Sequence, residues 1–92
     1  MIEYEWNEDK RLSNLARHGL DFRRAYLVYE NPGKLTLKSR NSHEPRLVDI
    51  AEVQGRALVL VYTLRGEAVR CISFRYTKRK ERRLYDEQRE EC

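Results

Sequence analysis

The most informative part of the sequence is Val69-Arg70-Cys71-Ile72-Ser73-Phe74-Arg75-Tyr76, which runs directly into Thr77-Lys78-Arg79-Lys80-Glu81-Arg82-Arg83-Leu84-Tyr85. The first segment alternates like a strand, and the second is typical of a helix that opens with the bases Lys78, Arg79 and Lys80. Such an opening is unfavourable, because the helix dipole favours acids in the first turn and bases in the last by about 0.3–1 kcal/mol each. We therefore expect these bases to meet phosphate rather than to stabilise the helix.

Before this strand, the pattern predicts further strands joined by short turns. Alternating Leu35 and Leu37 indicate an edge strand, and the unbroken apolar run at 57–62 indicates a central strand buried on both faces. Because short turns join antiparallel neighbours, the three later strands are expected to pair as an antiparallel meander. The expected segments are an edge strand at 34–38, a polar loop at 39–45, strands at 46–53, 57–62 and 69–76, and turns at 54–55 and 65–66.

The first third of the chain predicts a strand at 2–6 followed by two helices. Asn7 suits the N-cap of the first helix and Gly19 its C-terminal stop. Asp21 can cap a short second helix that reaches Tyr29. The element order is thus β-α-α-β-β-β-β-α. This order predicts a single α+β domain over residues 1–92, with the helices on one face of an antiparallel sheet.

The composition is that of a small folded domain with a moderate basic excess. The 92 residues carry a formal net charge of +4, which permits an anionic partner without demanding one. We expect Cys71 and Cys92 to be reduced thiols of a soluble, cytoplasmic protein, because the chain has no disulfide framework and no long apolar segment. With His18 and His43 they show no zinc-ligand spacing, so we expect no metal and no cofactor.

In its motif residues the chain resembles the BrnT family of toxins. The resemblance rests on an ordered set of residues that spans nearly the whole chain. These are Trp6, Lys10, Asn14, Arg17-His18-Gly19, Phe22, Ala25, Arg46, Arg70-x-Ile72-Ser73-x-Arg75 and Glu81-Arg82-x-x-Tyr85. The chain departs from the family pattern at Pro45, Ala51, Phe74 and Thr77, and these departures bear on substrate preference and strand geometry.

The resemblance implies a RelE-like fold and a metal-independent ribonuclease that cleaves RNA and arrests growth. It also implies a partner, a BrnA-like antitoxin that dimerises, binds operator DNA and covers the toxin. The toxin would then reach DNA only through that antitoxin, in a hetero-oligomer with the antitoxin dimer, and it would not bind membranes.

Metal-free cleavage of RNA requires a base for the 2′-hydroxyl proton, cations for the phosphorane and an acid for the leaving 5′-oxygen. Arg75 is the first candidate for the cation, because an arginine fork grips two phosphate oxygens. The alternative is that Arg75 pairs with an acid or binds the antitoxin. Arg70 lies five residues earlier, so on a straight strand it faces the opposite side. Both arginines could reach one phosphate only if a bulge or the strand end redirects one; otherwise Arg70 is a buried structural residue.

His18 and Tyr85 are the candidates for proton transfer. An imidazole exchanges protons near neutral pH, although a histidine at a helix C-terminus also interacts well with the dipole. Tyr85 could donate its hydroxyl proton or stack on a base, or it could pack against the sheet. Glu81, one helical turn earlier, could orient an arginine or neutralise Arg82 or Lys78.

The candidate phosphate contacts are Lys10, Arg46, Lys78 and Arg79. For Lys10 the alternative is an ion pair with Glu3 or Glu5, and for Arg46 an ion pair at the strand end. A second hypothesis covers the whole chain: a non-catalytic basic module that binds a partner protein or nucleic acid. The absence of an acid–base pair at recognisable spacing supports it, and binding without cleavage would distinguish it from a ribonuclease.

Overall fold

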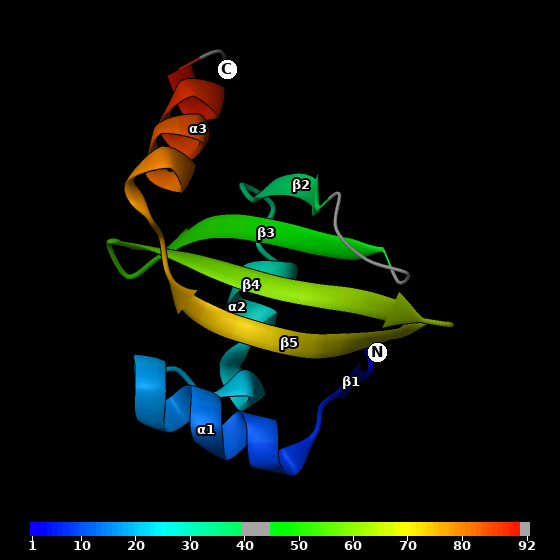
Figure 1. Cartoon of the computed structure of the whole chain (residues 1–92). Helices are drawn as coiled ribbons and strands as arrows, with labels where there is room; N and C mark the ends of the chain where they lie inside the picture. The colour runs from blue at the N-terminus through cyan, green and yellow to red at the C-terminus, as the bar shows by residue number, and fades with distance from the viewer. Residues whose placement is uncertain (40–44, 91–92) are drawn as a thin grey trace.

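The computed structural model describes residues 1–39 and 45–90, and within them the chain forms a five-stranded sheet with helices on both faces (Figure 1). The order of the strands across the sheet is β1-β5-β4-β3-β2. The strands are β1 (Tyr4–Glu5), β2 (Leu35–Ser39), β3 (Arg46–Val53), β4 (Arg56–Arg65) and β5 (Ala68–Tyr76). The helices are α1 (Glu8–His18), a 3₁₀ turn η1 (Phe22–Arg24), α2 (Tyr26–Tyr29) and α3 (Arg79–Glu90). No helix of the described residues is long and apolar enough to span a membrane.

The predicted meander is confirmed, but the expectation of a purely antiparallel sheet was wrong. Strands β2 to β5 pair antiparallel in chain order, whereas β1 pairs parallel with β5 through Tyr4–Val69 and Glu5–Arg70. Short turns determine only the pairing of consecutive strands. Strand β1 is separated from the meander by all the N-terminal helices, and these carry the chain across the sheet before β2 begins (Figure 1).

The N-terminal helices begin and end as expected from their capping residues. The Asn7 side chain accepts a hydrogen bond of 3.1 Å from the Lys10 amide, and Gly19 ends α1 in the left-handed region with φ 74°. Asp21 caps the next segment by accepting from the Arg23 amide. The expected second helix is divided, because η1 is a 3₁₀ turn and α2 follows it as a single short helix.

These helices cover one face of the sheet and enclose the main core. Phe22, Ala25 and Val28 lie under 2% exposed, packed against strands β3, β4 and β5. The sheet contributes Ala51, Leu58, Leu60, Tyr62, Val69, Cys71 and Phe74 to this core. Two departures from the family pattern, Ala51 and Phe74, are therefore packing positions.

The expectation that all helices share one face was also wrong, because α3 packs on the opposite face. Tyr85 of α3 clusters there with Ile50 and Val59. Ile50 and Ala51 are both fully buried although they are adjacent, so β3 supplies a core on each side of the sheet. We call the side that carries Ile50, Val59 and Tyr85 the α3 face. Figure 1 shows α3 rising from the end of β5, away from α1 and α2.

Strand β3 also carries a buried charge, which its apolar sequence pattern does not predict. Asp49 is fully buried, and its carboxylate accepts from Lys34 Nζ at 2.7 Å, the Thr36 hydroxyl at 2.7 Å and the Tyr62 hydroxyl at 3.1 Å. Burial, followed by the Asp49 charge, raises the pKa of Tyr62. The carboxylate is therefore satisfied within the fold, as a buried charge requires.

A bulge in β5 decides which side chains share a face. Val61 pairs with Ser73 and Tyr62 pairs with Cys71, so Ile72 has no partner on β4. Beyond this point, Arg75 lies opposite Val59 and Arg70 lies opposite Thr63. Since Val59 and Thr63 are on the same side of β4, the bulge places both arginines on the α3 face.

Candidate functional site

Arg75 is held at the end of β5 by the first turn of α3. Its Nη1 and Nη2 donate to the two carboxylate oxygens of Glu81, each at 2.8 Å, and Nη1 also donates to the Tyr76 carbonyl at 3.2 Å. Hydrogen bonds from Arg75 lower the pKa of Glu81, and the carboxylate in turn raises the pKa of Arg75. Arg75 is thus paired with an acid, as in the alternative considered for it, and Glu81 also accepts a hydrogen bond from the Lys78 amide to cap α3.

Arg70 lies on the same face but is paired with a different acid. Its Nη1 is 3.3 Å from Glu5 Oε1 across the β1–β5 pairing. Its side chain is 28% exposed, so Arg70 is a partly buried residue held in an ion pair. Ser73 lies between Arg70 and Arg75 on the α3 face, because all three are paired with alternate residues of β4.

A hollow of about 240 Å³ lies between α1 and the edge of β5, and we call it the β5 hollow. Its α1 residues share one helix face, since they fall at spacings of three and four. In the described part of the chain, Lys10 and Arg17 have no ion-pair partner, so their charges are uncompensated. The lining residues are Lys10, Ser13, Asn14, Arg17, His18, Ile72 and Ser73.

The position of α1 against the hollow depends on Asn14. Its amide nitrogen donates to the Phe74 carbonyl at 2.8 Å and its amide oxygen accepts from the Phe74 N–H at 3.1 Å. It also donates to the Leu20 carbonyl. Strand β1 pairs with β5 only as far as Arg70. The Asn14 side chain therefore takes the place of a neighbouring strand at Phe74. Asn14 is one of the residues that carry the family resemblance, but its sequence context predicts no such role; the available signal is an amide within an otherwise amphipathic helix.

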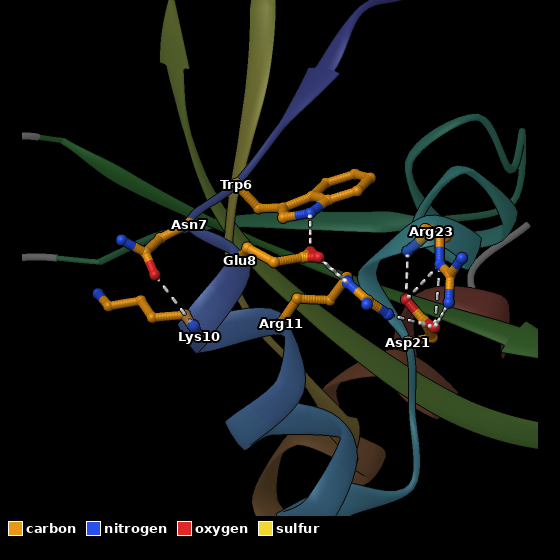
Figure 2. A network of polar contacts seen from close by, with 7 residues as sticks. All are labelled: Trp6, Asn7, Glu8, Lys10, Arg11, Asp21 and Arg23. Atoms are coloured by element: carbon orange, nitrogen blue, oxygen red, sulfur yellow. Dashed lines mark hydrogen bonds and ion pairs between the residues drawn. The ribbon is translucent and has the colours of Figure 1, made fainter.

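A second network positions the start of α1 (Figure 2). Trp6 Nε1 donates to Glu8, which pairs with Arg11 at 2.6 Å, and Arg11 reaches Asp21 at 3.0 Å. Burial alone would raise the pKa of Asp21, but hydrogen bonds from Arg23 and Arg11 outweigh it and lower the pKa to about 2. Figure 2 shows the Lys10 side chain directed away from this network, and the Lys10 backbone amide donates to the Asn7 side chain.

Tyr85 lies apart from the β5 hollow, beneath α3. It is 4% exposed, and its hydroxyl accepts a hydrogen bond of 3.3 Å from the Glu52 amide. Arg89 pairs with Glu52 at 2.8 Å beside it. Tyr85 therefore packs against the sheet, which is the alternative considered for it.

The remaining predicted residues lie around the α3 face. Arg46 shares the side of β3 that carries Val48 and Ile50, and it lines a second hollow of about 350 Å³ with Lys38 and Thr63. Lys78 and Arg79 are exposed at the start of α3. The structure thus brings Lys10 and His18 together in the β5 hollow, and it places Arg46, Arg70, Arg75 and Tyr85 on the α3 face.

Two further predictions concern thiol and metal chemistry. Cys71 is a free, buried thiol, and burial raises its pKa to about 12. Cys92 and His43 lie outside the described residues. Within residues 1–39 and 45–90, no group of three or more His, Cys, Asp or Glu side chains gathers as a metal site would require.

The fold is that of a small α+β protein in which Lys10 and Arg17, cations without ion-pair partners in the described residues, line a hollow at one edge of the sheet. A comparison with protein families matches residues 6–81 to the ribonuclease toxin BrnT of type II toxin–antitoxin systems. The chain therefore belongs to the BrnT family of ribonuclease toxins, whose type II systems pair each toxin with an antitoxin. A comparison with curated proteins finds no match.

Proposed function

We propose that the chain is a metal-independent endoribonuclease toxin that binds RNA along the edge of β5 and arrests growth. The observation that carries the proposal is the β5 hollow. Lys10 and Arg17 present uncompensated charges there, and His18 and Ser73 lie beside them. A cluster of cations that lacks internal acid partners attracts phosphate strongly, and it does so without regard to base sequence.

Arg75 is proposed to stabilise the phosphorane from the α3 side of the same strand. A guanidinium has five N–H groups, and Arg75 uses three of them on Glu81 and Tyr76. The others remain for a phosphate oxygen, and Glu81 keeps the fork in one orientation. Arg70 and Arg46 on the α3 face, and Lys78 and Arg79 at the start of α3, extend the path of the RNA backbone.

His18 is the proposed proton-transfer residue. In the reaction, the 2′-oxygen loses its proton to a base and attacks phosphorus, and the bond to the 5′-oxygen breaks as an acid protonates it. The products are a 2′,3′-cyclic phosphate and a 5′-hydroxyl. His18 lines the hollow beside Lys10, whereas Tyr85 is buried with its hydroxyl engaged by Glu52. The geometry favours His18 for this role, and it favours Tyr85 as a support for α3.

The antitoxin is proposed to be a BrnA-like protein. As a dimer it would bind operator DNA and hold the toxin in a hetero-oligomer, so that the toxin reaches DNA only through it. This part of the proposal rests on membership of a type II family.

The test is incubation of the purified protein with end-labelled RNA in EDTA. We expect cleavage that leaves 2′,3′-cyclic phosphate ends. Replacing His18 with Ala removes the proton-transfer group, and such groups contribute about 10²–10⁴-fold to rate, so a loss of that size is expected. Arg75→Ala is expected to cause a comparable loss because it removes a cation at the developing charge.

The matched control is Arg83→Ala, which removes an exposed cation of α3 that lines neither hollow. It is expected to cleave at the wild-type rate. RNA that binds the wild type but stays intact in EDTA would contradict the enzyme and support the non-catalytic basic module. Full activity in both His18→Ala and Arg75→Ala would refute the assignment of these residues.

A further inference from the structure

A hollow on the side of the sheet covered by α1 and α2 is distinct from the proposed RNA site. It has a volume of about 550 Å³, within the range of roughly 300–1,000 Å³ typical of binding pockets. We call it the Tyr76 groove. Its lining residues are Leu15, Gly19, Leu20, Asp21, Arg24, Leu27, Val53, Gln54, Arg56, Leu58, Phe74 and Tyr76. None of these residues lines the β5 hollow.

Most of the groove wall is apolar and part of it is open to solvent. Leucines from α1, α2 and β4 form it together with Val53, and Tyr76 remains 42% exposed at its rim. Aliphatic walls suit aliphatic or aromatic side chains, because these lose unfavourable contact with water when they enter. They offer few hydrogen-bond partners to the polar edges of nucleobases.

The rim of the groove is basic. Arg24 and Arg56 have no ion-pair partner in the described chain. The Arg56 guanidinium donates to the Tyr76 hydroxyl at 3.2 Å and lies 5.8 Å from the centre of its ring. The one acid of the groove, Asp21, is already bound by Arg11 and Arg23. The groove therefore presents uncompensated positive charge around an apolar floor. Tyrosine and arginine are also the residues that most often dominate binding energy at protein interfaces.

We propose that the Tyr76 groove is a docking site for the antitoxin. The occupant is an acidic segment of that protein, with apolar side chains in the groove and carboxylates on Arg24 and Arg56. This inference rests on the proposed function, because it takes the partner from the type II toxin family. The Tyr76 groove and the β5 hollow are adjacent at the end of α1, where Asn14 and Leu15 line one each. An antitoxin anchored in the groove is thereby placed to extend over the RNA site.

The test uses the full chain and, as a probe, the purified protein encoded by the reading frame next to its own. Affinity is measured by calorimetry for the wild type, for the double variant Arg24→Glu/Arg56→Glu and for Tyr76→Ala. Truncating one of the few residues that dominate an interface weakens binding by about 30-fold or more, and reversed charges add repulsion, so we expect a loss of at least that size for the double variant. Both arginines are exposed, so the variants are expected to keep the wild-type circular dichroism and melting temperature.

Two controls separate this inference from the proposed function. Arg83→Glu reverses an exposed cation of α3 outside the groove and is expected to bind the probe as the wild type does. RNA cleavage in EDTA is measured for every variant in parallel. Wild-type cleavage with at least a 30-fold loss of probe binding in the double variant supports the proposal.

Probe binding within twofold of the wild type in both groove variants would overturn the docking site while leaving the ribonuclease intact. Loss of RNA binding in the double variant with unchanged probe binding would assign the groove to RNA and also overturn the proposal. Absence of cleavage by the wild type would instead refute the proposed function, whatever the probe does.

Discussion

Asn14 is the residue on which the geometry of the β5 hollow depends most directly. It is 8% exposed and satisfies both the N–H and the C=O of Phe74 on the side of β5 away from β4, where no strand of the described residues pairs with Phe74. Buried backbone groups left without partners lose their hydrogen bonds to protein and to water alike. Asn14 therefore has a structural role although it is a residue of the family motif. It sets the distance between the basic face of α1 and strand β5.

Replacing Asn14 with Leu is expected to destabilise the protein by about 2–3 kcal/mol, because it leaves the Phe74 amide and carbonyl unpaired in a nearly buried position. The measurement is the free energy of unfolding from urea denaturation. Ser13→Ala, at an exposed neighbouring position, is the control and is expected to change it by less than about 0.5 kcal/mol. An Asn14→Leu variant as stable as the wild type would show that the Phe74 groups find water instead.

At the scale of the element, α3 depends on a few contacts at its ends and one in its middle. Glu81 joins its first turn to Arg75, Tyr85 packs on β3 and β4, and Arg89 reaches Glu52. The basic opening of this helix is stabilised by Glu81 itself, which caps the Lys78 amide. The Arg75–Glu81 pair therefore links the proposed phosphorane cation to the placement of α3.

A double-mutant cycle with Arg75→Met and Glu81→Gln should measure this link. Both side chains are 19% exposed and meet as a two-bond fork, so we expect a coupling free energy of about 1–2 kcal/mol. The measurement is again the free energy of unfolding in urea. The control cycle is Arg82–Asp86, a more exposed pair of the same helix, for which about 0.3–0.5 kcal/mol is expected. Equal coupling free energies in the two cycles would show that the Arg75–Glu81 pair stabilises α3 no more than an exposed ion pair does.

At the scale of the whole molecule, the cations of α1, β5 and the start of α3 border one edge of the sheet. The Tyr76 groove lies on the side of the sheet that α1 and α2 cover. RNA held by phosphate contacts loses affinity as the salt concentration rises. In a plot of the logarithm of the association constant against the logarithm of the salt concentration, each phosphate neutralised on a single strand makes the slope steeper by about 0.7. Lys10→Gln is accordingly expected to reduce the slope by about 0.7.

The salt dependence of RNA affinity is measured by fluorescence anisotropy of labelled RNA between low and physiological salt, with Arg83→Gln as the matched control. The control is expected to leave the slope unchanged. If the two variants reduce the slope equally, the RNA follows the general charge of the protein and not the β5 hollow.

The sequence by itself determined the local elements and the meander. Asn7, Gly19 and Asp21 act within a few residues of themselves, and the turns at 54–55 and 65–66 join strands that are already neighbours, so nearby residues carry the information. It also predicted membership of the BrnT family through an ordered set of motif residues, and the match over residues 6–81 confirms this at the level of the family. The roles of the site residues stay a prediction.

Only the tertiary structure decided the parallel pairing of β1, the placement of α3 on the opposite face, and the faces of Arg70 and Arg75. Each of these depends on contacts between residues far apart in the chain. The pairing of Tyr4 with Val69, the packing of Tyr85 on Ile50 and the bulge at Ile72 are the deciding contacts. A single unpaired residue reverses the side on which every later side chain of a strand lies, and no local pattern in the sequence records it.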